Sequence, residues 1–176
     1  MRTIVYVGVS LDGFIAGEGG DISWLTAFEN KEINDSYNNF MAEIDAIVIG
    51  RGTYETVISF STWPYEKKVF LLSTSIKQVP EKLKDKLGIL SMNPAEVRKY
   101  LSDNGFHSVY VDGGKVIQGF LREDCIDEII ITRLPVLLGG GIPLFGSLRD
   151  MLEFTHIRTD VYSNGLVKSH YIRKRN

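Results

Sequence analysis

Cysteine and histidine are scarce in this 176-residue chain, which contains one cysteine, Cys125, and three histidines that stand singly. A lone cysteine cannot form an intramolecular disulfide, and no Cys/His cluster has the spacing of a zinc site, so we expect no bound metal. Charge of one sign is not in excess either, because 20 Lys and Arg residues face 22 Asp and Glu residues and leave a formal net charge of −2. This near balance argues against a dedicated nucleic-acid binder, which normally shows a strong basic excess.

Long apolar runs are also missing. Continuous apolar stretches such as residues 46–49 have the length of strands, far below the roughly 20 residues that a membrane-spanning helix needs. The first residues alternate between apolar and polar and do not show a charged segment followed by an apolar stretch, as an export signal would. We therefore expect a cytoplasmic protein without a membrane partner.

Three familiar nucleotide-binding or catalytic motifs are absent from the sequence. No G-x-G-x-x-G follows the first predicted strand, which excludes the Rossmann dinucleotide fingerprint. Gly114-Lys115 is followed by Val116, where a phosphate-binding P-loop needs a hydroxyl for magnesium. No G-x-S-x-G nucleophile elbow occurs either. These absences disfavour hydrolase and metalloenzyme functions.

What the chain does contain is the composition of a globular protein, with 44% hydrophobic and 24% charged residues. Its length predicts one domain over residues 1–176, and no repeat or linker interrupts it. Strand and helix patterns alternate along the chain. The predicted strands are 3–10, 46–49, 68–72, 108–111, 128–132, 154–162 and 166–172, and the predicted helices are 32–44, 94–102 and 114–122.

The strongest local signals lie near the ends of these elements. Asn93-Pro94-Ala95-Glu96 is typical of a helix start, with a capping Asn, Pro at the first helical position and Glu reaching back. Residues 17–21 are glycine-rich and predict a loop, whereas Ser163-Asn164-Gly165 between two strands predicts a hairpin. We therefore predict an α/β fold with a mainly parallel central sheet, covered by helices, and a C-terminal antiparallel hairpin.

Three stretches fall just after predicted strands, where open α/β sheets collect their ligands. Residues 50–55 join a buried strand to a helix, so free amides and the fixed charge of Arg51 could hold a phosphate there. Residues 73–75 offer a row of small hydroxyls, and residues 112–115 again join a strand to a helix through two glycines. Taken singly, each stretch is also explained as a tight turn, and Arg51 as a partner of Glu55. Together they indicate a phosphate-bearing cofactor.

The order of four motifs carries a resemblance that covers almost the whole chain. They read Ser-Leu-Asp-Gly-Phe-Ile-Ala at 10–16, Ile-Val-Ile-Gly-Arg-Gly-Thr-Tyr-Glu at 47–55, Val-Asp-Gly-Gly-Lys at 111–115 and Leu-Leu-Gly-Gly-Gly at 137–141. The set resembles the dihydrofolate-reductase-like superfamily. More narrowly, it is similar to the C-terminal reductase domain of bacterial bifunctional riboflavin-biosynthesis deaminase/reductases and to stand-alone relatives of that domain. This resemblance implies a three-layer fold, and because dimers are common among relatives it also suggests a homodimer.

The resemblance implies NADPH as the cofactor and assigns residues to it. Arg51 matches a position that contacts the cofactor phosphates, and Gly113 one of a glycine pair beneath the cofactor. Trp24 matches a tryptophan near the substrate in folate reductases. The full cofactor set carried over is Ile15, Ala16, Gly50, Arg51, Thr53, Ser73, Thr74, Gly113, Gly114 and Lys115.

The catalytic carboxylate is where the chain departs from the resemblance. Folate reductases carry an acid on the helix before the Gly-Arg-x-Thr turn, and here the nearest candidate is Asp35, which otherwise reads as a solvated helix residue. Asp12 is the second candidate, and its structural alternative is a turn cap before Gly13.

The leading hypothesis is an NADPH-dependent reductase of a small planar heterocycle, pterin-like or pyrimidine-like, that receives hydride from the nicotinamide. The first alternative is a catalytically idle NADP(H)-binding protein that acts as a sensor or a dimeric scaffold, because no clean catalytic acid is seen. The second is an accessory folate reductase.

Overall fold

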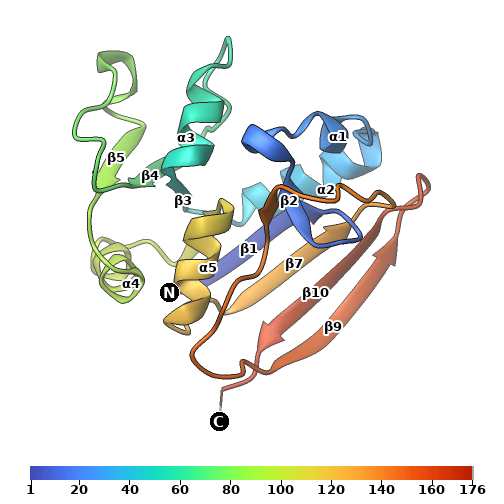
Figure 1. Ribbon diagram of the computed structural model, residues 1–176. Coiled ribbons are helices and arrows are strands. Elements are labelled where there is room, and N and C mark those ends of the chain that lie inside the picture. The colour runs from blue at the N-terminus through green and yellow to red at the C-terminus, as the bar shows by residue number, and fades with distance from the viewer. Residues whose placement is uncertain (176) are drawn as a thin grey trace.

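The computed structural model describes residues 1–175, in which strands and helices alternate along the chain (Figure 1). The strands are β1 (Arg2–Val9), β2 (Phe14–Ala16), β3 (Ala46–Gly50), β4 (Lys68–Leu72), β5 (Leu87–Leu90), β6 (Ser108–Asp112), β7 (Glu128–Arg133), β8 (Ile142–Pro143), β9 (Phe154–Val161) and β10 (Val167–Arg173). The helices are α1 (Ser23–Thr26), α2 (Lys31–Ala42), α3 (Arg51–Ile58), α4 (Pro94–Asp103) and α5 (Gly114–Arg122), and the 3-10 turns are η1 (Glu18–Gly20) and η2 (Glu81–Leu83).

A central sheet of order β5-β4-β3-β6-β1-β7-β10-β9 runs through the described residues. In this spatial order, each strand from β5 through β4, β3, β6 and β1 to β7 is parallel to its neighbours. Strand β10 pairs antiparallel with both β7 and β9. Strand β1 lies in the middle, where Ile4 is opposite Tyr110 of β6 on one side and Glu128 of β7 on the other. Strands β2 and β8 form a separate antiparallel pair. Because β5 to β7 are parallel, their carboxyl ends share one edge of the sheet.

Different helices cover the two faces of the sheet, which gives three layers. On one face, residues of α4 and α5 share a buried apolar cluster with residues of β1, which includes Ile117 and Val5. On the other face, residues of α2 and α3 share a second cluster with β1, which includes Phe40 and Ile4. Successive residues of a strand point to opposite faces, so adjacent β1 residues enter different cores. Among residues 1–175, no helix combines the length and the apolar character needed to cross a bilayer.

The predicted α/β fold, with a mainly parallel sheet and a C-terminal antiparallel hairpin, is confirmed. The capping box at the start of α4 is also confirmed, because Asn93 accepts from the Glu96 amide and Glu96 accepts from the Asn93 amide. The helix expected at 32–44 begins one residue earlier, at Lys31, because the Asn30 side chain caps its first turn. It ends at Ala42, two residues before the predicted end. Residues 17–21 contain the short turn η1 instead of a plain loop.

Candidate functional site

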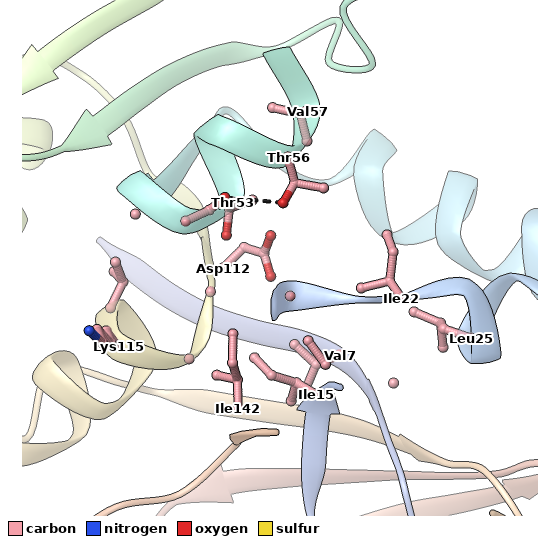
Figure 2. Close-up of a pocket in the computed structure, with 18 of the residues that line it drawn as sticks. Val7, Ile15, Ile22, Leu25, Thr53, Thr56, Val57, Asp112, Lys115 and Ile142 are labelled. Atoms are coloured by element: carbon pink, nitrogen blue, oxygen red, sulfur yellow. Dashed lines mark hydrogen bonds between the residues drawn. The ribbon is translucent and has the colours of Figure 1, made fainter. Parts of the chain in front are cut away.

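A cavity of about 1520 Å³ opens at the carboxyl ends of the parallel strands (Figure 2). Its wall is built from residues at the ends of β1, β3, β4 and β6 and from the first turns of α3 and α5. This is the edge at which open α/β sheets bind ligands. The structure brings all the predicted cofactor residues to this cavity: Ile15, Ala16, Gly50, Arg51, Thr53, Ser73, Thr74, Gly113, Gly114 and Lys115.

Helix α3 begins directly where the buried strand β3 ends. Gly50 is its N-cap residue and provides no side-chain hydrogen bond, so the first amides of the helix face the cavity without a protein cap. A Cβ at Gly50 would lie 2.7 Å from Cγ2 of Val116, which explains why the junction between β3 and α5 needs glycine. Arg51 follows, 3.6 Å from the Glu55 carboxylate and with 59% of its side chain exposed. The corner therefore offers amides and an exposed positive charge to an anion.

Helix α5 begins in a similar way after β6. Gly113 is the N-cap with φ +94°, a conformation that L side chains rarely adopt, and it too forms no side-chain cap. A Cβ there would lie 2.6 Å from Oγ1 of Thr53 on α3. A Cβ on Gly114 would lie 2.6 Å from Cγ2 of Ile142. The glycine pair lets α3, α5 and β8 approach one another around the cavity.

The hydroxyl groups of residues 73–75, which follow β4, have two different roles. The Ser73 side chain is buried and accepts hydrogen bonds from the amides of Ser75 at 3.3 Å and Ile76 at 3.1 Å, so it holds its own turn. Thr74 and Ser75 are exposed and line the cavity. The hydroxyls available to a ligand are therefore those of Thr74 and Ser75, while Ser73 fixes the turn that presents them.

The opposite wall is a short β-ribbon. Ile15 and Ala16 lie on β2, which pairs with β8 through Ala16 and Ile142. Gly141, with φ +131°, passes so close to the backbone of Ala16 and Gly17 that a Cβ there would overlap it. This close approach holds the long segment after β7 across the cavity edge.

Asp112, the last residue of β6, belongs to the predicted strand-end stretch 112–115, but no catalytic role is predicted for it from the sequence. Figure 2 shows its carboxyl group pointing into the space between Thr56 of α3 and Ile22. Burial raises the pKa of Asp112, and the Gly113 amide and the Tyr110 hydroxyl lower it by less. The available signal was its place immediately before the glycine pair, at the end of a central strand.

Tyr37, Tyr65 and Tyr110 lie near enough to this carboxyl for its charge to contribute to their raised pKa values. Tyr6, Tyr37, Tyr65 and Tyr110 line the cavity, and the Tyr110 hydroxyl donates to the carbonyl oxygen of Tyr6 at 3.0 Å. Burial, with a smaller contribution from the charge of Asp112, raises the pKa of Tyr37 to about 12. These hydroxyls therefore stay protonated at neutral pH and can donate hydrogen bonds.

Both predicted catalytic carboxylates lie outside the cavity wall. Asp35 forms an ion pair with Lys31 at 2.5 Å, and its side chain is 55% exposed. Its helix neighbour Asn34 lines the cavity, but successive helical residues point about 100° apart, so Asp35 turns toward solvent. Asp12 accepts hydrogen bonds from Ser10 Oγ at 2.6 Å and from the Gly139 amide at 2.7 Å. These hydrogen bonds, of which the one from Ser10 has the largest effect, lower the pKa of Asp12. The Asp12 side chain thereby connects two loops.

Trp24 is likewise not among the residues that line the cavity. Its indole Nε1 donates to the carbonyl oxygen of Asp21 at 3.2 Å, and its ring packs in a small cluster with Leu134 and Tyr162. Its neighbour Leu25 reaches the cavity in its place.

Proteins of known structure that resemble this chain share its fold. A riboflavin biosynthesis-like protein from Shewanella sp. PV-4 is 41% identical and superimposes with a TM-score of 0.93, covering 99% of this chain and 100% of that one. The diaminohydroxyphosphoribosylaminopyrimidine deaminase/5-amino-6-(5-phosphoribosylamino)uracil reductase of Thermotoga maritima is 14% identical, with a TM-score of 0.73 over 98% of this chain and 56% of that one. The chain thus has the α/β fold of these proteins, with a mainly parallel sheet and an antiparallel C-terminal hairpin.

The chain belongs to the RibD C-terminal domain family, whose model matches residues 3–68 and 60–168. The predicted resemblance is thereby confirmed. An uncharacterized protein of Bacillus subtilis (strain 168), YwjB, is 34% identical over 175 residues, or 98% of each chain. The riboflavin biosynthesis protein RibD of Bacillus amyloliquefaciens is 34% identical over 100 residues, which cover 51% of this chain and 23% of that protein.

Proposed function

We propose that the protein is an NADPH-dependent reductase of a small pterin-like or pyrimidine-like heterocycle. One observation carries the proposal: a single cavity joins two glycine-started helix ends, one of which begins with Arg51, to a tyrosine-rich wall that holds the carboxyl of Asp112. The first part suits the phosphates of a dinucleotide, and the second suits a flat ring.

The residues present fit NADPH. The first amides of α3 and α5 would hold its phosphates, and the exposed guanidinium of Arg51 with the hydroxyls of Thr74 and Ser75 would hold the 2′-phosphate. Gly113 has a backbone that a larger residue would strain, and its missing side chain lets the start of α5 approach Thr53 of α3 at the edge of the cavity. When bound, NADPH supplies hydride from its nicotinamide ring.

The protein's own contribution is proton supply and exclusion of water. Reduction of a C=N bond needs a proton on nitrogen in addition to the hydride on carbon. Because burial raises the pKa of Asp112, its carboxyl group carries a proton at a higher pH than an ordinary aspartate and can donate it to the ring nitrogen. The tyrosine rings around it displace water and fix the plane of the substrate.

The proposal is tested by titrating the purified protein with NADPH and NADH and then by following absorbance at 340 nm with a panel of pterins, dihydropterins, dihydrofolate and aminopyrimidines. Preferential binding of NADPH together with oxidation by one panel member supports the proposal. Binding of NADPH without turnover on any member would favour the idle NADP(H)-binding alternative, and failure to bind NADPH would refute both. Oxidation by dihydrofolate alone would favour the accessory folate reductase.

A further inference from the structure

The basic side chains of the cavity wall lie in one of its two halves. This phosphate half consists of the first turns of α3 and α5 and of residues 73–75, and it holds Arg51 and Lys115 together with Glu55, which pairs with Arg51. Arg51 and Lys115 are the basic side chains that line the cavity in the part of the chain that the structure describes. The ring half is supplied by the end of β1, by residues 17–37 and by Tyr65, Tyr110, Thr132, Leu134 and Leu166. It contains aromatic and aliphatic side chains, the neutral polar residues Asn34 and Thr132, and two acids.

The acids of the ring half are Glu18 and Glu29, both exposed on its rim, and Asp112 lies where the two halves meet. Within residues 1–175, neither Glu18 nor Glu29 forms an ion pair. Desolvation is the first cause of the raised pKa of Asp112, and no cation is near enough to lower it. The ring half therefore presents uncompensated negative charge to whatever enters it.

One lysine lies close to this half without belonging to it. Lys168 of β10 places its Nζ 2.8 Å from Ser36 Oγ and 3.5 Å from the Asp160 carboxylate. The hydroxyl of Tyr6 lies 3.0 Å from the same Ser36 Oγ, so the serine and the tyrosine separate Lys168 from the cavity. Its charge is thus paired with Asp160, and its ammonium group is hydrogen-bonded to Ser36 of α2.

A phosphate ester would be poorly accommodated in such a half. A dianionic group placed there would lose hydration, meet no guanidinium or ammonium, and be repelled by Glu18 and Glu29. Amino groups and ring N–H groups behave in the opposite way, because carboxylates and tyrosine oxygens accept their hydrogen bonds. Flat rings also pack well against the tyrosines that form the wall.

We infer that the substrate is an unphosphorylated, flat heterocycle that carries amino or ring N–H donors, and that the protein discriminates against the phosphorylated form of the same ring. This inference rests on the proposed reductase function, since it assigns the phosphate half to the cofactor. By this inference, the substrate of this chain lacks the phosphate group of the phosphoribosyl compound that is named for the Thermotoga maritima relative.

The test uses a matched pair of ligands that differ only in the phosphate: 5-amino-6-(5-phosphoribosylamino)uracil and its dephosphorylated ribosylamino form. Riboflavin and its 5′-phosphate serve as a second pair. Binding to the NADPH-loaded protein is measured by calorimetry, which needs no turnover. In at least one pair, we expect the unphosphorylated member to bind at least tenfold more tightly.

The double variant Glu18→Lys/Glu29→Lys reverses the rim charge and should reduce this ratio to less than threefold. The matched control is Glu66→Lys/Asp150→Lys, which makes the same change in net charge at exposed positions outside the cavity and should leave the ratio as it is. An equal change in both double variants would mean that overall charge, not the rim, sets the preference, and would overturn the inference.

The inference is also overturned if phosphorylated members bind as tightly as their partners, or if no unphosphorylated member binds at all. In either case, a separate NADPH titration of the same preparation tests the proposed function. Tight NADPH binding would support the reductase proposal and refute only the inferred substrate class. Absence of NADPH binding removes both.

Discussion

Helices α2 and α4 begin with an asparagine cap, whereas α3 and α5 begin with a glycine that has no side chain to offer. Asn30 and Asn93 each accept a hydrogen bond at 2.9 Å from the amide of the third helical residue. At Gly50 and Gly113 no side-chain cap forms, and both residues open onto the cavity. The comparison distinguishes helix starts that stabilise the fold from helix starts that leave amides for a ligand.

The largest effect is expected one residue before the α5 start, at Asp112. Asp112→Asn keeps the shape of the side chain but removes its proton-donating carboxyl, so turnover should fall by about 100-fold while NADPH affinity changes little. Single-turnover measurements at 340 nm and a parallel NADPH titration check this. Equal turnover in the two proteins would remove Asp112 from proton transfer.

The same variant should change the pH dependence of stability. The folded-state pKa of Asp112 is raised above its unfolded value by burial. The ionised carboxyl therefore costs stability above the folded pKa, and this cost disappears as the pH falls toward the unfolded pKa. Asp112→Asn should consequently melt at a higher temperature than the natural protein at neutral pH, and the difference should shrink toward pH 4. A difference that grows on acidification would contradict the raised pKa.

Gly113→Ala tests the glycine start itself. The new Cβ would press on Thr53 Oγ1 in a backbone of φ +94°, so we expect NADPH affinity to fall about 30-fold, which corresponds to about 2 kcal/mol. Gly105→Ala is the matched control, because Gly105 has φ +81° with nothing within 4 Å of a Cβ. The control should lose about 1 kcal/mol of stability and bind NADPH normally. If the two variants bind NADPH alike, backbone strain alone explains the glycine.

Arg51→Ala should weaken NADPH about tenfold, or about 1.4 kcal/mol, and leave NADH nearly unaffected. The effect is kept modest because the side chain is 59% exposed and solvent screens its charge. Glu55→Gln removes the partner of Arg51 on the same helix and serves as the control, with little change expected for either cofactor. An equal loss for NADPH and NADH on Arg51→Ala would place the guanidinium on the pyrophosphate.

Asn93→Ala alters one of the two helix starts with an asparagine cap, and we expect it to have the smallest effect on NADPH affinity. Loss of the capping box should cost about 1 kcal/mol of unfolding free energy, measured in urea, with no change in NADPH affinity. A clear loss of NADPH affinity would show that capped and uncapped helix starts are not separate in function.

The sequence was sufficient for the fold and for bringing the strand-end residues to one cavity, because both depend on local signals. Continuous apolar runs such as β3 predicted buried parallel strands, and strand-end stretches such as residues 50–55 predicted a shared edge. Short elements such as β2 and β8 were missed, because their pairing depends on contacts between residues that are distant in the sequence. A strand of two residues has no pattern of its own.

The catalytic carboxylate could not be chosen from the sequence, because helical orientation and burial decide it. Asn34 and Asp35 are adjacent, and only the structure shows which of them faces the cavity. Asp12 precedes a glycine just as a cap residue does, and its bond to the Gly139 amide joins segments 127 residues apart. Asp112 gains its character from burial, which a linear motif does not reveal.

The place of β1 between β6 and β7 has a consequence for how the protein is made. The first strand leaves the ribosome long before residues 108–112 and 128–133, with which it must pair on its two sides. Until then its apolar residues, Val5 and Val7 among them, have no sheet to enter. Pairing of such distant segments is slow and leaves aggregation-prone surface exposed. We therefore expect nascent chains released before β7 to need a chaperone, and β1 to become protected only after β7 has emerged, although it is the first strand of the sheet to be made.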